Sequence, residues 1–213
     1  MSDRPGGEPR VHVKICGVTS PEDARRSVEA GASAIGVNLV PTSPRCVDLA
    51  TARVIAEAIG RDALVVAVVR DLSVADMRAV LAATGCGCLQ LHGDEPPELL
   101  DPLLPHAYKA IPVAAAEDVA RADLYGGEYV LLDSTAEGRS GGTGCAFDWS
   151  LAAALSMRRR VVLAGGLRPE NVAEAVRIVR PHTVDVASGV ESPGHPRKKD
   201  MARVCAFIRE ALR

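Results

Sequence analysis

Residues 11–40 of the chain read VHVKICGVTSPEDARRSVEAGASAIGVNLV, and this stretch holds one complete copy of the pattern that decides the fold. The β-branched runs at 11–16 and 34–40 have the composition of buried parallel strands. Between them, Ser20 stands before Pro21 and Glu22, which predicts a helix that begins at a capping hydroxyl followed by a first-turn proline. The stretch therefore predicts a strand–helix–strand unit.

The same unit recurs along the rest of the chain. Further strands are predicted at residues 64–69, 88–92, 108–113, 129–133, 161–165 and 184–188, with segments of helical period between them. Residues 168–170 (RPE) predict another helix start, and Val172, Val176 and Val179 form an apolar stripe after it. The last helix is predicted to bury a second stripe: Met201, Val204, Cys205, Ile208 and Leu212.

Eight strand–helix units in roughly 200 residues suit a closed barrel. An open doubly wound sheet would need Gly-x-Gly-x-x-Gly after its first strand, and Cys16-Gly17-Val18-Thr19 stands there instead. The predicted fold class is therefore α/β, a (β/α)8 TIM barrel, with a single domain at residues 11–213. Residues 1–10 are polar and rich in Gly and Pro, and we expect a disordered N-terminal tail there.

The composition of the chain limits the classes of molecule that it is expected to bind. The chain has 25 Lys plus Arg against 27 Asp plus Glu, so it lacks the basic excess that a nucleic-acid partner requires. No apolar run approaches the roughly 20 residues of a membrane span. Six irregularly spaced cysteines are typical of a reducing compartment. We expect a cytoplasmic protein with a small-molecule partner, no nucleic acid and no membrane, a monomer by default and a homodimer as the alternative.

The first strand places a reactive group at the barrel mouth. Alternation turns His12, Lys14 and Cys16 inward and the apolar residues between them toward the helices. A cation two residues below a thiol lowers its pKa from about 8.5, so Cys16 is a candidate base or nucleophile. A buried, inert cysteine is the alternative.

The sixth strand ends in a carboxylate, although Asp is disfavoured in strands. Asp133 is a candidate general acid with a pKa raised by partial burial, and a cap of the next turn is the alternative. One acid and one base on either side of a substrate suit an isomerisation through an enol or enamine.

Glycine-bearing loops follow the last two strands. Gly165 and Gly166 come after the seventh strand, and Ser188 and Gly189 come after the eighth. Backbone N–H groups at such loops bind phosphate in many barrels, so a phosphorylated ligand is predicted. The loop at 138–144, with Gly142 and Gly144, is a candidate to close over that ligand, and a mobile surface loop is the alternative.

Two further side chains complete the predicted pocket. Arg45, in a proline-stiffened loop, is a candidate clamp for a substrate carboxylate. His92 is predicted to point inward from the fourth strand, more as a hydrogen-bonding wall than as a proton carrier. Cys86-x-Cys88 lacks the spacing of a zinc site, so no metal is predicted.

Seven ordered motifs carry a resemblance to a known family. They are KICG at 14–17, SPR at 43–45, LQLHG at 89–93, LDS at 132–134, GGTG at 141–144 with FDW at 147–149, LAGGLRPENV at 163–172 and VDVASGVE at 184–191. Together they resemble phosphoribosylanthranilate isomerase, the eight-fold barrel of tryptophan biosynthesis. The resemblance implies an Amadori rearrangement of N-(5-phosphoribosyl)anthranilate to the 1-deoxyribulose product, with no metal or organic cofactor.

The resemblance also implies roles for single residues. Asp133 would protonate the ribose ring oxygen and Cys16 would remove the C2′ proton, while Asp185 would support the electrostatics of the site. The substrate-binding set would be Lys14, Arg45, His92, Gly142, Gly144, Gly165, Gly166, Asp185, Ser188 and Gly189.

The chain departs from the family pattern around the second strand. Asn38 and its neighbours stand where aromatic residues are frequent, and Cys46 follows Arg45 where tyrosine is common. These departures leave open a second function, in which the chain is an isomerase of a related phosphoribosyl-arylamine. Two more functions stay open: the barrel isomerase of histidine biosynthesis, which uses an aspartate where Cys16 stands, and a non-catalytic barrel that binds a phosphorylated ligand.

Overall fold

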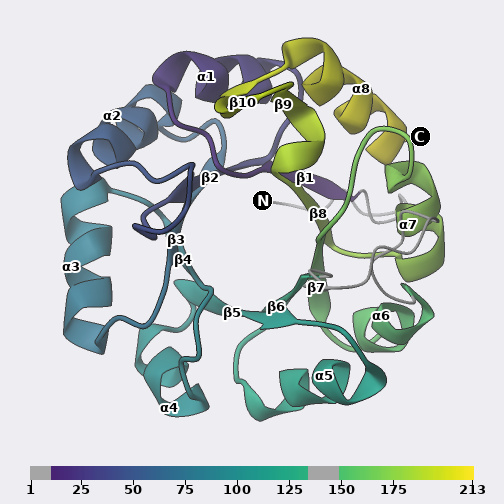
Figure 1. Ribbon diagram of the computed structural model, residues 1–213. Helices are drawn as coiled ribbons and strands as arrows, with labels where there is room; N and C mark the ends of the chain where they lie inside the picture. The colour runs from purple at the N-terminus through teal and green to yellow at the C-terminus, as the bar shows by residue number, and fades with distance from the viewer. Residues whose placement is uncertain (1–10, 134–148) are drawn as a thin grey trace.

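The computed structural model describes residues 11–133 and 149–213, and it shows eight parallel strands closed into a ring with helices outside (Figure 1). The ring closes where β1 pairs with β8, with Lys14 opposite Asp185. The strands are β1 (His12–Ile15), β2 (Ala34–Asn38), β3 (Leu64–Val69), β4 (Cys88–Leu91), β5 (Ala107–Pro112), β6 (Tyr129–Asp133), β7 (Arg160–Ala164) and β8 (Thr183–Val186). The predicted TIM barrel is confirmed, and each strand lies within two residues of its predicted bounds.

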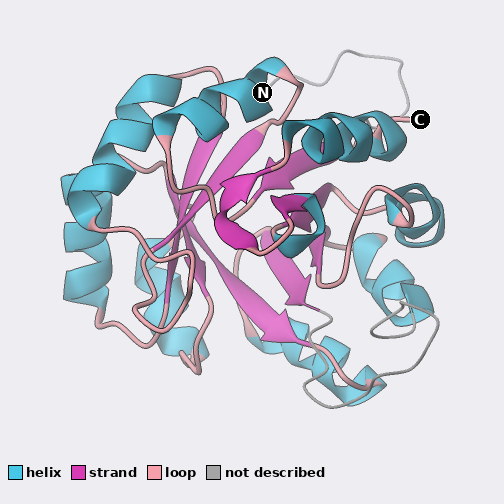
Figure 2. Cartoon of the chain, turned by 45° about the horizontal axis from the view of Figure 1, so that its top comes forward, coloured by secondary structure: helices cyan, strands magenta, loops and turns pink. Residues whose placement is uncertain are grey.

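A helix follows each strand, and Figure 2 shows these helices as an outer layer around the strands. They are α1 (Pro21–Glu29), α2 (Leu49–Ile59), α3 (Val74–Thr84), α4 (Pro97–Leu100), α5 (Ala116–Ala120), α6 (Trp149–Ser156), α7 (Val172–Val179) and α8 (Met201–Ala211). Short 3-10 turns lie at η1 (Asp101–Leu103), η2 (Arg121–Leu124) and η3 (Ser188–Val190). None of the helices in the described part of the chain is long and apolar enough to span a membrane.

The first helix begins where the sequence predicts, and the seventh begins later. Ser20 Oγ accepts a hydrogen bond from the Asp23 N–H at the start of α1. The start of α7 is Val172 rather than residues 168–170, because the Asn171 side chain first closes a loop. Its Oδ1 accepts from the Arg168 N–H at 2.8 Å, and its Nδ2 donates to the Gly166 carbonyl at 3.0 Å.

The core has two layers, as a barrel requires. Val13 and Ile15 lie in the larger layer between strands and helices, whereas Leu131 and Val162 belong to the smaller cluster inside the ring. The stripe predicted for the last helix is wrong at Cys205, which is exposed. Helix α8 instead buries Val204, Phe207, Ile208 and Ala211, a face turned slightly from the predicted one.

An antiparallel hairpin that the sequence analysis did not predict stands between η3 and α8. It consists of β9 (Glu191–Ser192) and β10 (His195–Lys199), and Figure 1 shows it near α1 and α8. The Arg197 carbonyl accepts from Thr19 Oγ1 at 2.6 Å, and Arg197 Nη1 donates to the Cys46 carbonyl at 2.7 Å. The hairpin therefore ties the chain after β8 to the loops that follow β1 and β2.

Candidate active site

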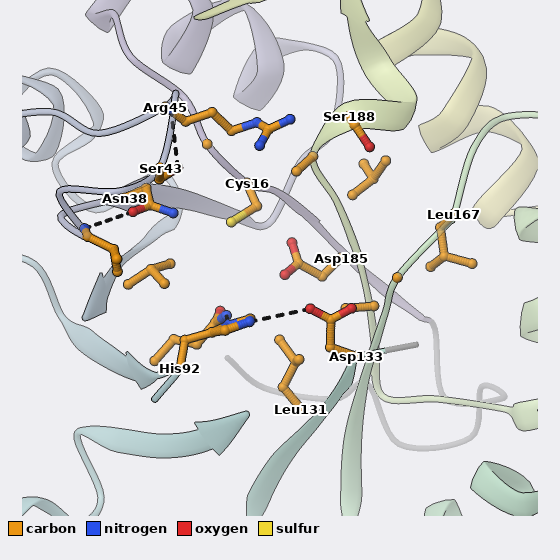
Figure 3. A pocket seen from close by; sticks show the side chains of 18 of the residues that line it. Cys16, Asn38, Ser43, Arg45, His92, Leu131, Asp133, Leu167, Asp185 and Ser188 are labelled. Carbon is orange, nitrogen blue, oxygen red and sulfur yellow. Dashed lines mark hydrogen bonds and ion pairs between the residues drawn. The ribbon is translucent and has the colours of Figure 1, made fainter. Parts of the chain in front are cut away.

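A cavity of about 320 Å3 lies at the carboxyl ends of the strands. Most of the predicted site residues line it: Cys16, Arg45, His92, Asp133, Gly165, Gly166, Asp185 and Ser188. Figure 3 shows Cys16, Asp133 and Asp185 around it. Cys16 follows the end of β1, Asp133 ends β6, and Asp185 lies in β8. Gly142 and Gly144 lie outside the described residues, as does the N-terminal tail predicted at 1–10.

Lys14 lies beneath the cavity rather than on its wall. Its ammonium is 2.8 Å from Asp185 Oδ2 and 2.8 Å from Gln90 Oε1, and its side chain is 2% exposed. Burial lowers the pKa of Lys14, but the charge of Asp185, the charges of Cys16 and Tyr108, and the hydrogen bond to Asp185 together outweigh it, so the pKa lies well above the ordinary lysine value. Lys14 therefore anchors Asp185, whose buried Oδ1 accepts no hydrogen bond from any described residue.

The thiol of Cys16 is more basic than the sequence suggests. Burial is the main cause of its raised pKa, and the charge of Asp185 raises it further, while Lys14 and Lys199 act in the opposite direction. The prediction of a lowered pKa is wrong for this structure, because burial and the charge of Asp185 outweigh the lowering effect of Lys14. The sequence shows the lysine two residues away, and only the β1–β8 pairing shows its partner.

Asp133 faces His92, and a chain of hydrogen bonds fixes the imidazole. Lys14 and the Tyr108 hydroxyl both donate to Gln90 Oε1, so Gln90 Nε2 is the group 2.8 Å from His92 Nδ1. An amide N–H donates, so Nδ1 accepts and neutral His92 carries its proton on Nε2. That nitrogen lies 3.4 Å from Asp133 Oδ2, and Asp133 Oδ1 is buried with no hydrogen-bond partner in the described part of the chain.

Arg45 already holds a carboxylate of its own chain. Its Nε and Nη2 donate to the two oxygens of Glu191 at 2.5 and 2.9 Å. These hydrogen bonds raise the pKa of Arg45. Although burial opposes it, the pKa of Glu191 is lowered by the hydrogen bond from Arg45 and the charge of Lys199. Lys199 Nζ donates to the same carboxylate at 3.2 Å.

Sequence reasoning missed the roles of Glu191 and Lys199. Glu191 closes the VDVASGVE motif, so a signal for it was present. No sequence motif pointed to Lys199, because the hairpin that positions it was not predicted.

The residues of the two glycine loops have different roles. Gly165, Gly166 and Ser188 line the cavity, but Gly189 is not among its lining residues. A Cβ on Gly189 would lie 2.0 Å from the Leu167 carbonyl oxygen, so this glycine lets the loops after β7 and β8 touch. Its place in the phosphate site stays a prediction.

No cluster of three or more His, Cys, Asp or Glu side chains suited to a metal ion occurs among residues 11–133 and 149–213. The polar groups that line the cavity include one thiol, two carboxylates, one imidazole and guanidinium groups, together with hydroxyl and amide side chains and the glycine loops. Such a set can bind an anion and move protons between positions on a bound molecule.

Comparisons with known proteins agree with this geometry. Residues 13–210 match a family model described as N-(5'phosphoribosyl)anthranilate (PRA) isomerase. The chain is 47% identical over 206 residues to the N-(5'-phosphoribosyl)anthranilate isomerase of Myxococcus xanthus (strain DK1622), covering 94% of this chain and 96% of the relative.

Solved structures match over the same range. Monomers of the dimeric phosphoribosylanthranilate isomerase from Thermotoga maritima give a TM-score of 0.81 at 36% identity, covering 94% of this chain and 98% of theirs. A phosphoribosyl anthranilate isomerase in complex with reduced 1-(o-carboxyphenylamino)-1-deoxyribulose 5-phosphate gives 0.82 at 38% identity, with the same coverage.

Proposed function

The chain belongs to the N-(5'-phosphoribosyl)anthranilate isomerase family, and we propose on that basis that it converts N-(5-phosphoribosyl)anthranilate to 1-(o-carboxyphenylamino)-1-deoxyribulose 5-phosphate in tryptophan biosynthesis. One observation carries the proposal: Cys16 and Asp133, a base and an acid from different strands, line the same cavity as the glycine loops. The proposed reaction is an intramolecular oxidation and reduction of the sugar, and it uses no metal or organic cofactor.

In the first step Asp133 donates a proton to the ribose ring oxygen. The C1′–O4′ bond breaks with its electron pair on oxygen, and the anilino nitrogen forms a C=N bond to C1′, giving a protonated Schiff base. His92 Nε2, 3.4 Å from Asp133 Oδ2, supports the proposed role by orienting the carboxyl group at the cavity.

In the second step the Cys16 thiolate takes the proton from C2′. The C2′–H electrons form the C1′–C2′ double bond and those of the C=N bond return to nitrogen, so an enolamine results. Addition of a proton at C1′ and loss of the C2′ hydroxyl proton then give the C2′ ketone, so that no proton is gained or lost over the whole reaction. The iminium charge favours the thiolate, which offsets the burial that raises the pKa of Cys16.

We assign the two ends of the substrate to opposite sides of the cavity. Nη1 of Arg45 is not used by Glu191, so the guanidinium retains an edge for the anthranilate carboxylate. Backbone groups around Gly165, Gly166 and Ser188 are assigned to the phosphate, with Gly189 setting the spacing of the loops. Gly142 and Gly144 stay in the proposed substrate-binding set on their sequence motif alone.

Asp185 and Lys14 are proposed to act as a pair. Lys14 holds one oxygen of Asp185, and the other oxygen has no partner among the described residues and belongs to a carboxylate that lines the cavity. We assign to this anchored carboxylate a role in the electrostatics of the site.

The test is the loss of anthranilate-type fluorescence when purified protein meets freshly generated substrate, with the product identified by its mass. Rapid conversion supports the proposal, and a folded protein that converts nothing refutes it. A related phosphoribosyl-arylamine is the second candidate substrate, because no Phe, Tyr or Trp lines the described part of the cavity and β2 contributes Asn38. Comparing the rate with the aniline analogue, which lacks the carboxylate, separates the two.

We also propose that the chain works as a cytoplasmic monomer. The large apolar side chains exposed in the described residues are few: Leu49, Val54, Leu64, Leu124 and Met157. A homodimer is the alternative, and light scattering decides between 22.3 kDa and twice that mass.

A further inference from the structure

Three charged side chains form a chain of ion pairs that starts at Arg45 in the cavity wall and continues to Glu191 and Lys199, which are not among the residues that line the cavity. Arg45 contacts Glu191 through two hydrogen bonds, and Lys199 Nζ lies 3.2 Å from Glu191 Oε1. Their side chains are 21%, 8% and 1% exposed, respectively, so Lys199 is the deepest of the three. Lys199 belongs to β10, the strand that no sequence motif predicted.

This chain of ion pairs is adjacent to Cys16. A Cβ on Gly17 would lie 2.3 Å from Arg45 Cδ, so the arginine side chain crosses the backbone of the residue after Cys16. Lys199 Nζ also donates to the Ala187 carbonyl at 3.1 Å, and Ala187 lines the same cavity as Cys16. The ammonium is therefore fixed from two sides, directly behind the wall.

The charges around the thiol do not cancel. Lys14 is paired with Asp185, and Arg45 is paired with Glu191. Tyr108, the remaining titratable neighbour, is a neutral phenol whose pKa is raised by burial. Lys199 is left as the surplus positive charge among these groups.

We propose that Lys199 is a positioning residue of the active site: its buried ammonium, held by Glu191 and the Ala187 carbonyl, supplies the uncompensated positive charge that stabilises the Cys16 thiolate. The inference rests on the proposed function, because it concerns the same base. Nothing in the reaction requires Lys199 to touch the substrate, since its charge acts through the wall.

The electrostatics of the two groups agree with this role. The charge of Lys199 lowers the pKa of Cys16, against burial and Asp185, which raise it. Burial lowers the pKa of Lys199 itself, while Glu191 and Cys16 act to keep it charged. Formation of the thiolate therefore strengthens the charge on Lys199 that stabilises it.

Lys199→Met tests the proposal, and the chain offers a matched control. The variant keeps the length of the side chain, and Glu191 retains both hydrogen bonds to Arg45, so the fold is expected to persist. Lys198→Met makes the same charge change one residue earlier, at an exposed position. Lys199→Arg keeps the charge, and Lys199→Gln replaces the Met variant if that one is unfolded by circular dichroism.

The readout is alkylation of Cys16 by neutral iodoacetamide as a function of pH, followed by mass spectrometry on the tryptic peptide of residues 15–25, whose single cysteine is Cys16. We expect the midpoint to rise by about one pH unit in Lys199→Met, so that alkylation near neutral pH is about tenfold slower. Lys198→Met and Lys199→Arg should follow the wild type. The low-pH limb of kcat/KM should move with the alkylation midpoint.

An unchanged midpoint in folded Lys199→Met, or an equal shift in Lys198→Met, would overturn the proposal. The two inferences can fail separately, because alkylation needs no turnover. A wild type that converts no substrate but shows the shift refutes the proposed function and retains the role of Lys199 toward the thiol. If the wild type converts substrate but Lys199→Met leaves the alkylation midpoint unchanged, the proposed function stands and the role of Lys199 is refuted.

Discussion

Lys14 and Asp185 lie 171 positions apart in the chain, yet their pairing sets the chemistry of the site. Alternation along the first strand predicts that Lys14 and Cys16 face inward, and both do. It does not predict that Asp185 takes the lysine charge, because that contact exists only once β1 pairs with β8. At the residue scale, sequence therefore predicts which groups are present and misses which of them are neutralised.

The tautomer of His92 is a direct consequence of this network. Lys14 and Tyr108 orient the Gln90 amide, so neutral His92 should carry its proton on Nε2. Long-range 1H–15N correlation spectra at about pH 8, where an ordinary imidazole is neutral, report the tautomer. His195, which is exposed, is the internal reference for an imidazole in water. A dominant Nδ1–H form of His92 would contradict the assigned network.

Glu191 should make stability depend on acid pH. Its pKa is lowered in the folded protein, so its contribution is full above the ordinary glutamate pKa of about 4.3 and is lost as the pH falls through the folded value. Glu191→Gln should therefore melt below the wild type at pH 7, and the two melting temperatures should converge on acidification. Glu57→Gln, which breaks an exposed Arg–Glu pair on α2, is the control. It should leave the melting temperature unchanged both at pH 7 and in acid. A gap that persists unchanged in acid would refute this role for Glu191.

At the scale of elements, the strands and helices follow from pattern, but the connections that build the site do not. Ser20 and Pro21 fix the start of α1, as local capping chemistry predicts. The start of α7 is displaced because Asn171 bonds to Gly166 and Arg168, and the β9–β10 hairpin is held by contacts to the loops after β1 and β2. Such nonlocal contacts leave no periodic signal.

Gly189→Ala tests whether the two glycine loops must touch. The added Cβ would lie 2.0 Å from the Leu167 carbonyl oxygen. Because this oxygen belongs to the backbone, it cannot move aside as the end of a flexible side chain could. We expect a loss of roughly 1–3 kcal/mol in the free energy of unfolding, together with weaker binding of inorganic phosphate measured by calorimetry. Gly194→Ala, at the hairpin turn with nothing near its Cβ position, should leave phosphate binding unchanged. Wild-type phosphate affinity in folded Gly189→Ala would contradict the proposed spacing role.

At the scale of the whole molecule, the closed ring brings residues from both ends of the chain to one cavity. The sequence predicts the ring because the strand–helix unit repeats, and the candidate acid and base then follow from their places at strand ends. It could not predict that Gly189 lies against the Leu167 carbonyl or that Glu191 pairs with Arg45, since both depend on how neighbouring loops pack in three dimensions.

Lys14→Met should weaken the whole barrel. The change leaves Asp185 as a buried carboxylate without its cation, which typically costs about 3–5 kcal/mol in the free energy of unfolding. Urea unfolding measures this loss, and adding Asp185→Asn to the same chain should recover part of it, because the unpaired charge is removed. A Lys14→Met variant as stable as the wild type would show that the pair does not support the ring.

The most direct test of the proposed isomerase is kcat/KM for Cys16→Ala and Asp133→Asn beside the wild type, with circular dichroism to show that each variant is folded. We predict conversion of N-(5-phosphoribosyl)anthranilate by the wild type and a fall of at least about a hundredfold in each variant, as expected for a lost general base or acid. A folded variant that stays within about threefold of the wild type would contradict the assignment of that residue.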